Sequence, residues 1–250
     1  MDFSPGHTQP PHPLHAARLK CDRAKTHIGA LKRSIAHFQR DPLRSVKIQQ
    51  GNLRGASWPP PAPVSWPLIV SDVATNLRAA LDFIAWQLAI KRLREEGESR
   101  EPRNTLFSIC SSPKAFLHHK TKGQLADVLK DSLPLIESFQ PYSGSERPEN
   151  HLQAILRELS NITKHRALIR PRQSMRLTAR PGGVTAITFG SVGVQVMSSN
   201  PSGSSEPPVS LLVNIEIPSL SPTEYDISVL DDIHRQVRDK ILPRFSVFFD

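Results

Sequence analysis

The chain of 250 residues has few of the residues that form covalent or metal cross-links. Its two cysteines, Cys21 and Cys110, lie far apart and neither belongs to a Cys-x-x-Cys pair. This excludes a disulfide framework and a zinc site of the paired-cysteine type. A chain of this length buries a core large enough to fold without such links. The low cysteine content and an N-terminus without a basic, apolar leader favour a cytoplasmic protein.

Long apolar runs and the motifs of common enzymes are also missing. The most apolar stretch, residues 68–90, is interrupted by Ser71, Asp72, Asn76, Arg78 and Asp82, which excludes an ordinary membrane span. The sequence has no phosphate-cradling glycine loop, dinucleotide fingerprint or Gly-x-Ser-x-Gly elbow. The adjacent His118 and His119 would point about 100 degrees apart on a helix, which is unsuitable for a shared metal. We therefore predict no membrane contact, no metal and no cofactor, and we favour a non-enzymatic protein.

Helical periodicity is what the sequence does contain. Apolar residues recur at alternating steps of three and four over residues 17–38, and a wide apolar face covers residues 67–94. Both patterns predict amphipathic helices that pack in an antiparallel bundle. The proline-rich stretch 58–67 predicts a stiff extended connector that lies on the surface through its two tryptophans, and Ser112-Pro113 predicts the start of a short helix. Residues 221–224, Ser-Pro-Thr-Glu, resemble a capping box, which predicts that the last helix begins there.

Strand patterns appear in the last third of the chain. Apolar residues flank the Pro-Gly-Gly turn between residues 177 and 189, and they alternate over 192–196 and 211–217, which is typical of an antiparallel sheet with one buried face. We predict an α+β fold in which an antiparallel helical bundle carries a small antiparallel β-sheet, at about 172–217, before the C-terminal helix. The expected organisation is a disordered tail, 1–13, and a single domain, 14–250.

The formal net charge of +9 is unevenly distributed. Residues 1–66 contain ten Lys or Arg against three Asp or Glu, and residues 151–183 contain seven against one. Residues 184–250 reverse the balance, with four against eight. Such clustering favours polyanionic partners through counterion release, although a solvated basic face gives the same pattern.

The most informative segment is residues 151–170, HLQAILRELSNITKHRALIR. Its apolar residues share one side of a predicted helix: Leu152, Ile155, Leu156, Leu159 and Ile162. On roughly the opposite side lie Asn161, Lys164 and His165, followed by Arg166. These residues offer hydrogen-bond donors, an imidazole and positive charge, so they are candidates for binding a phosphate or for acid–base chemistry.

Four polar positions of the helix predicted at 67–94 also bear on a possible binding site. Asn76 flanks the apolar face, where a buried amide needs hydrogen-bond partners, and it is our fifth binding candidate. Together with Asp72 it is equally compatible with a structural polar network across the bundle. Arg78 and Asp82, four residues apart, are expected to form a weak ion pair on the outer side. We assign no catalytic residue and no metal ligand.

Four segments in order carry a family resemblance: SDVATNLRAALDFIAWQLA (71–89), FSIC (107–110), FQPY (139–142) and LRELSNITKHR (156–166). They resemble a family of uncharacterised bacterial and phage helical proteins, which implies no established activity. That family often has acidic residues where this chain has Ser160 and Thr163. A looser resemblance is to HEPN-type helical bundles, many of which are ribonucleases or toxin–antitoxin partners. Their motif, an arginine followed by four to six residues and a histidine, is absent here, since Arg157 and His165 are separated by seven residues.

Three functions are compatible with these patterns. The first is a non-enzymatic interaction module that binds a protein partner or associates with itself. The second is a nucleic-acid-binding or HEPN-like ribonuclease module that uses the basic surface, through backbone contacts rather than stacking, because aromatic residues are few. The third is a small-ligand pocket between the helices predicted at 67–94 and 151–170.

Overall fold

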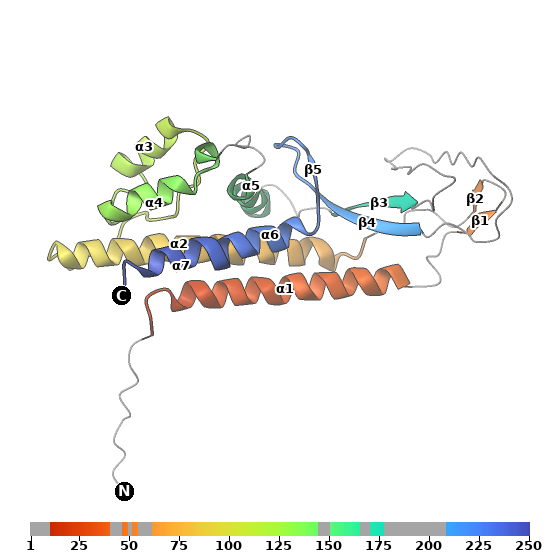
Figure 1. Cartoon of the computed structure of the whole chain (residues 1–250), viewed down its shortest axis with the longest axis horizontal. Coiled ribbons are helices and arrows are strands. Elements are labelled where there is room, and N and C mark those ends of the chain that lie inside the picture. The colour runs from red at the N-terminus through yellow and green to blue at the C-terminus, as the bar shows by residue number, and fades with distance from the viewer. Residues whose placement is uncertain are drawn as a thin grey trace, which may run out of the picture.

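The computed structural model has the predicted α+β architecture, a helical bundle with a small antiparallel sheet ahead of the C-terminal helix (Figure 1). The residues that the structure describes are 11–40, 47–49, 52–54, 62–144, 151–165, 171–177 and 209–250. Within this part of the chain, no helix has the length and apolar character needed to cross a membrane.

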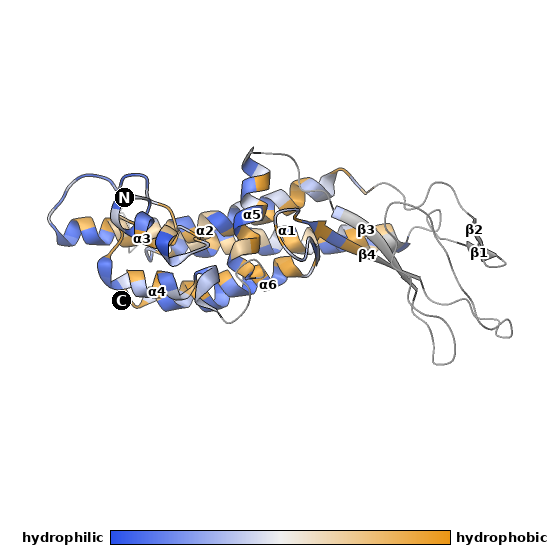
Figure 2. Ribbon diagram, turned by 90° about the horizontal axis from the view of Figure 1, so that it is seen from above, coloured by the Kyte–Doolittle hydropathy of each residue, from blue (hydrophilic) through white to orange (hydrophobic). Residues whose placement is uncertain are grey.

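Two long antiparallel helices form the base of the bundle, α1 (His15–Arg40) and α2 (Ser65–Glu95) (Figure 1). The predicted stripe of α1 is fully buried at Ala17, Cys21 and Ala24, and these small side chains let α2 approach closely. The apolar residues of α2 are buried along almost its whole length, so α2 is the central helix. Figure 2 shows apolar residues gathered where the helices of the bundle meet.

The start of α2 corrects the prediction of an extended connector over residues 58–67, because the helix already begins at Ser65. Trp66 lies within the first turn of the helix and is fully buried. Its indole N–H donates to Ser34 Oγ at 2.9 Å, and its ring lies 5.1 Å from that of Phe38. Pro67 is tolerated here because residues in the first helical turn have no intrahelical acceptor for their N–H groups. Residues 58–61 of the predicted connector lie outside the described residues.

The chain next forms short elements above α2. These are α3 (Pro113–Lys122), the single 3₁₀ turns η2 (Lys130–Ser132) and η3 (Pro141–Ser143), α4 (Leu133–Ser138), and α5 (Leu152–His165). As predicted, Ser112 begins α3, because its hydroxyl accepts the Ala115 N–H at 3.3 Å. The predicted apolar face of α5 packs into the core, and α5 lies across α2 (Figure 1).

The three-stranded sheet consists of β3 (Pro171–Leu177), β4 (Val209–Glu216) and β5 (Glu224–Asp226), antiparallel and in that order. The predicted alternation holds at Val213, Ile215 and Ile217, whose side chains are buried in the main core. A separate two-stranded ladder, β1 (Lys47–Gln49) with β2 (Asn52–Arg54), was not predicted. The predicted hairpin after residue 177 and the strand at 192–196 lie outside the described residues, as do residues 1–10 of the predicted tail.

The prediction that the last helix begins at residues 221–224 is wrong. Residues 224–226 instead pair with β4 as strand β5, with Tyr225 opposite Ile215, because the Ile217 N–H donates to the Thr223 carbonyl at 2.7 Å and turns the chain back. The helix begins five residues later as α6 (Val229–Arg235) and continues through a π-helical stretch, η5 (Gln236–Ile241), into α7 (Leu242–Ser246). The π-helical stretch ends two residues before Pro243, which has no N–H to donate.

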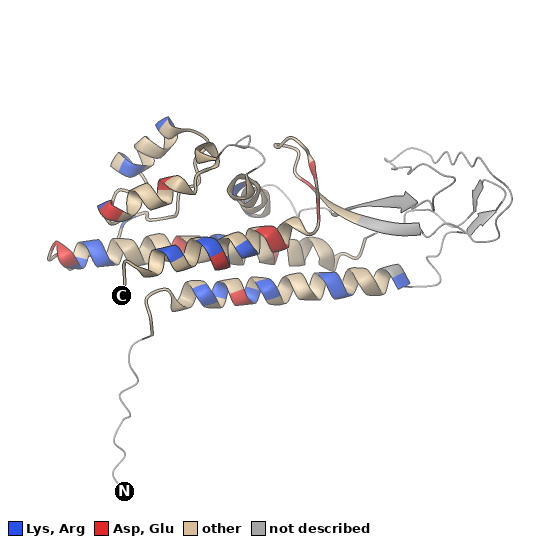
Figure 3. Ribbon diagram, in the orientation of Figure 1, with Lys and Arg blue, Asp and Glu red and all other residues tan. Residues whose placement is uncertain are grey.

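Ion pairs attach α6 to α1. Asp231 lies 2.7 Å from Lys32 and 3.3 Å from Lys25. Burial alone would raise the pKa of Asp231, but the hydrogen bonds from these two lysines lower it. Arg238 of η5 similarly lies 3.5 Å from Asp22 of α1. Figure 3 shows basic residues along α1 and acidic residues on α6 and η5, so part of the positive charge of α1 is neutralised within the fold.

Acid should destabilise the α1–α6 contact through His234, which is buried between these helices. Burial and the charge of Lys25 lower the pKa of its imidazole, against the opposing effects of Asp239, Asp231 and the backbone of Cys21. Because the unfolded chain takes up this proton below about pH 6.5, the stability that His234 contributes at neutral pH is lost as the pH falls through that value. We expect a decrease of up to about 1.4 kcal/mol per pH unit, measured by urea denaturation between pH 7.5 and 5.

The variant His234→Gln removes the titrating group, so the free energy of unfolding should depend less steeply on pH. His118→Gln, at an exposed histidine of α3, is the matched control and should keep the wild-type slope. Equal slopes in wild type and His234→Gln would show that another group causes the acid sensitivity.

Candidate functional site

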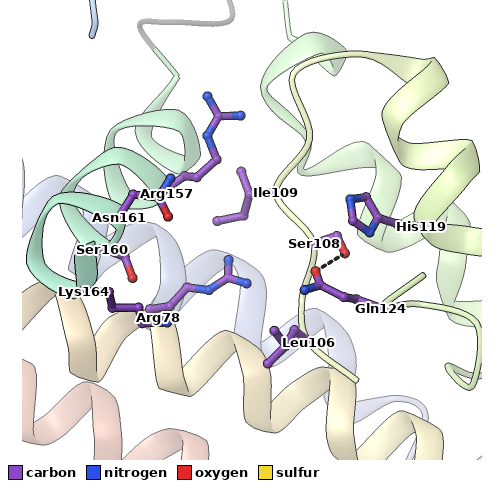
Figure 4. Close-up of a pocket in the computed structure, with 10 residues that line it drawn as sticks. All are labelled: Arg78, Leu106, Ser108, Ile109, His119, Gln124, Arg157, Ser160, Asn161 and Lys164. Atoms are coloured by element: carbon purple, nitrogen blue, oxygen red, sulfur yellow. Dashed lines mark hydrogen bonds between the residues drawn. The ribbon is translucent and has the colours of Figure 1, made fainter. Parts of the chain in front are cut away.

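A cavity of about 230 Å³ lies between α2, α5 and the segment 105–124 (Figure 4). We call it the basic pocket. Its cationic wall, on α2 and α5, consists of Arg78, Arg157, Ser160, Asn161 and Lys164. Its neutral wall, on the segment 105–124, consists of Leu106, Ser108, Ile109, His119 and Gln124. None of these ten lining residues is acidic.

One face of α5 provides most of the cationic wall. Arg157, Asn161 and Lys164 are spaced by four and three residues, so they lie together on the side away from the core, and the buried Ser160 lies at the edge of this face. In Figure 4, Arg157 and Asn161 project from α5 toward the neutral wall, while Arg78 extends from α2 below them. The cations therefore reach the cavity from two different helices.

Arg78 is held by an ion pair with Asp82, at 3.1 Å between Nη2 and Oδ1. The sequence predicted this pair, but on the outer side of α2, and that placement is wrong. The two side chains are only 12% and 20% exposed, because the segment that begins at residue 105 covers them. Phe107 N–H donates to the same carboxylate oxygen at 3.0 Å. Burial raises the pKa of Asp82 and lowers that of Arg78, and the charge of each partner opposes this effect.

Gln140 fixes the backbone of the neutral wall. This buried amide accepts the Cys110 N–H at 2.7 Å, and its Nε2 donates to the carbonyls of Ser108 and Ile136 at 3.0 and 3.1 Å. Ser108 Oγ in turn donates to Gln124 Oε1 at 3.0 Å, the bond drawn in Figure 4. Because all of these bonds join groups of the protein itself, they preorganise the wall.

His119 closes the pocket on the side of α3. Its Nδ1 is enclosed and has no hydrogen-bond partner among the described residues. A Cβ on Gly123 would lie 2.8 Å from this nitrogen, so glycine at position 123 makes room for the ring. Burial, together with the neighbouring His118, lowers the pKa of the His119 imidazole. The side chain is therefore neutral at pH 7, so it presents an imidazole rather than a cation.

The structure brings together only part of the predicted site. Asn161 and Lys164 both line the basic pocket, as their shared helix face indicated. Asn76 is not among the lining residues, and its amide donates to the Asp72 carbonyl of its own helix at 2.8 Å. His165 is the last residue of α5, but its side chain lies outside the described residues, as does the whole of Arg166.

Sequence reasoning missed most of the other lining residues. Arg157 had a usable signal, because it precedes Asn161 by four positions and Lys164 by seven, on one helix face. Arg78 was noted only as a surface ion pair. Ser108, His119 and Gln124 had no signal, because they converge through the path of the loop and not through spacing along one element.

The comparisons with known proteins add no assignment to this geometry. No protein-family model, curated protein or solved structure matches the chain. The resemblance to the uncharacterised helical family thus stays a prediction. Within the described ranges, no cluster of three or more His, Cys, Asp or Glu is placed to hold a metal ion.

Breaking the Arg78–Asp82 pair should destabilise the protein. Arg78→Met leaves the Asp82 carboxylate without its cation in a largely buried position, and we expect a loss of about 3 kcal/mol in the free energy of unfolding. Adding Asp82→Asn removes the charge and keeps an acceptor for the Phe107 N–H, so the double variant should recover most of that loss. Urea denaturation at pH 7 measures both effects.

The control for this pair lies on the same helix with the same spacing. Lys91 and Glu95 form an exposed ion pair at 3.2 Å, so Lys91→Met should cost less than about 1 kcal/mol. Similar losses for Arg78→Met and Lys91→Met would mean that burial of the first pair has no energetic consequence.

Gln140→Leu should loosen the neutral wall. The variant leaves the Cys110 N–H unpaired in a buried position, which costs about 2 kcal/mol. We also expect faster amide hydrogen exchange at Cys110, because its N–H no longer has an acceptor. Gln87→Leu, at a half-buried glutamine of α2, is the comparison variant. Unchanged exchange at Cys110 would contradict the proposed role of Gln140.

Proposed function

We propose that this protein binds a phosphate-bearing anion in the basic pocket. The observation that carries this proposal is that three cationic side chains, Arg78, Arg157 and Lys164, line one cavity that has no acidic lining residue. Neutral donors of the same cavity complement them. A concave site with a few convergent polar groups is the usual form of a ligand-binding site.

The internal ion pairs leave donors free for a ligand. Arg78 uses Nη2 for Asp82, and Arg157 uses Nε for Glu158 at 3.0 Å. A guanidinium has five N–H donors, so both arginines retain several. The carboxylates hold the guanidinium groups in position, while Lys164 adds a charge at the C-terminal end of α5. The site therefore keeps a net positive charge.

Phosphate fits this arrangement better than a carboxylate does. A phosphate monoester carries about −1.5 to −2 charges at pH 7 and three acceptor oxygens that point in different directions. The cations of the basic pocket arrive from α2 and from α5, so they can contact separate oxygens. Charge-assisted bonds from arginine and lysine to phosphate are among the stronger hydrogen bonds in proteins.

The other two predicted functions have less support. A protein interface usually includes a contiguous apolar patch, whereas the large apolar side chains exposed within the described segments are distributed over several elements: Leu19, Val64, Leu68, Leu117 and Val247. For nucleic acid, Asp231 pairs with both Lys25 and Lys32 on α1 and offsets one of their two positive charges. The basic face of α1 and the basic pocket also lie on opposite sides of α2 (Figures 1 and 3), so they do not form one continuous surface.

Isothermal titration with inorganic phosphate at constant ionic strength tests this function. Wild type should bind phosphate, and Lys164→Met should bind it about tenfold more weakly, since one charge-assisted hydrogen bond contributes about 1.5 kcal/mol or more. Lys164 is exposed, so this variant should keep the wild-type melting temperature.

The charge-matched control is Lys240→Met, at an exposed lysine outside the pocket, which should bind like wild type. Two results would overturn the proposal. One is the absence of phosphate binding by wild type. The other is an equal loss in both variants, which would place binding on the general surface. Homopolymeric RNA that binds Lys164→Met and wild type equally, while phosphate does not bind, would support the nucleic-acid function instead.

A further inference from the structure

We propose that the ligand of the basic pocket is a small hydroxylated phosphomonoester, such as a polyol or sugar phosphate. Its phosphate lies on the cationic wall and its hydroxyl groups lie on the neutral wall. This inference rests on the proposed function and goes beyond it, because it specifies the uncharged part of the ligand.

The neutral wall carries hydrogen-bonding groups that a bare phosphate would not need. Gln124 uses its Oε1 to accept from Ser108, while its amide nitrogen, with two N–H donors, bonds to no other side chain or backbone group described here. The Ser108 oxygen keeps its acceptor capacity, and the neutral imidazole of His119, whose Nδ1 is enclosed, donates or accepts through Nε2. Hydroxyl groups match this mixture because each of them both donates and accepts.

Positive charge lies on only one of the two walls. The three cations, Arg78 on α2 and Arg157 and Lys164 on α5, all belong to the cationic wall. The burial that lowers the pKa of His119 keeps the neutral wall uncharged at pH 7. A second anionic group on the ligand would find no cation there, whereas an uncharged polar group finds donors and acceptors.

The size of the cavity limits the organic part. With about 230 Å³ and about 30 Å³ for each water of the liquid, the pocket holds roughly eight waters. A phosphate fills part of that space, which leaves room for a few carbons with their hydroxyl groups. Drug-sized ligands occupy cavities of about 300–1,000 Å³, so a nucleoside would extend beyond this cavity and gain few contacts from it. Ile109, which projects between the walls (Figure 4), supplies an apolar contact for the carbon chain.

Calorimetric titration of four probes tests the inference: inorganic phosphate, glycerol 3-phosphate, ribose 5-phosphate and adenosine monophosphate. For wild type we expect at least one of the two small esters to bind about tenfold more tightly than inorganic phosphate, which corresponds to one or two additional hydrogen bonds. Adenosine monophosphate should bind no better than inorganic phosphate.

Variants of the neutral wall identify where that gain arises. Gln124→Met keeps the side-chain length and removes the amide, so it should lose the preference for the esters while inorganic phosphate binds as in wild type. If Gln124→Met fails to fold, Ser108→Ala serves instead, because the backbone bonds to Gln140 do not involve the Ser108 hydroxyl. Thermal melting in the absence of ligand confirms that each variant is folded.

The outcomes separate the two proposals. If no probe binds, including inorganic phosphate, the proposed function itself is wrong. If inorganic phosphate binds but the small esters bind no more tightly, only the further inference is wrong. A preference for esters that persists in folded Gln124→Met and Ser108→Ala, or tightest binding of adenosine monophosphate, would also overturn it.

Discussion

The Asp82 carboxylate of α2 joins the elements on which the basic pocket depends. It pairs with Arg78 on the same helix and accepts the Phe107 N–H of the segment that passes above. Through its Oδ1 atom, Asp82 therefore positions Arg78 and attaches the neutral wall to α2. Because a largely buried carboxylate needs such partners to stay ionised, the ion pair and the path of the loop depend on each other.

The pocket combines two kinds of preorganisation. On the cationic wall, α5 holds its polar residues at fixed helical spacing while its opposite face packs into the core. On the neutral wall, which has little regular structure, Gln140 provides the backbone hydrogen bonds that a helix or strand would otherwise supply. Both walls are held by contacts within the protein, which reduces the entropy lost on binding.

Much of the fold could be predicted because its helices and the described strand β4 have clear periodicity. The stripes of α1 and α5 and the alternation in β4 are buried as expected. The errors occurred where local signals and tertiary contacts disagree. Residues 221–224 have the composition of a helix cap, but pairing with β4 makes the following residues a strand. Trp66 belongs to a proline-rich stretch, yet Ser34 and Phe38 of α1 hold it in the core.

By itself the sequence determined the α+β class, the amphipathic helices and the shared helix face of Asn161 and Lys164, because periodicity along one element fixes which residues point the same way. Only the tertiary structure decided that Arg78 is enclosed, that Asn76 bonds within its own helix, and that Ser108, His119 and Gln124 face α5. These residues meet across a loop of irregular path. Its course depends on long-range hydrogen bonds to Asp82 and Gln140, and no local spacing in the sequence encodes them.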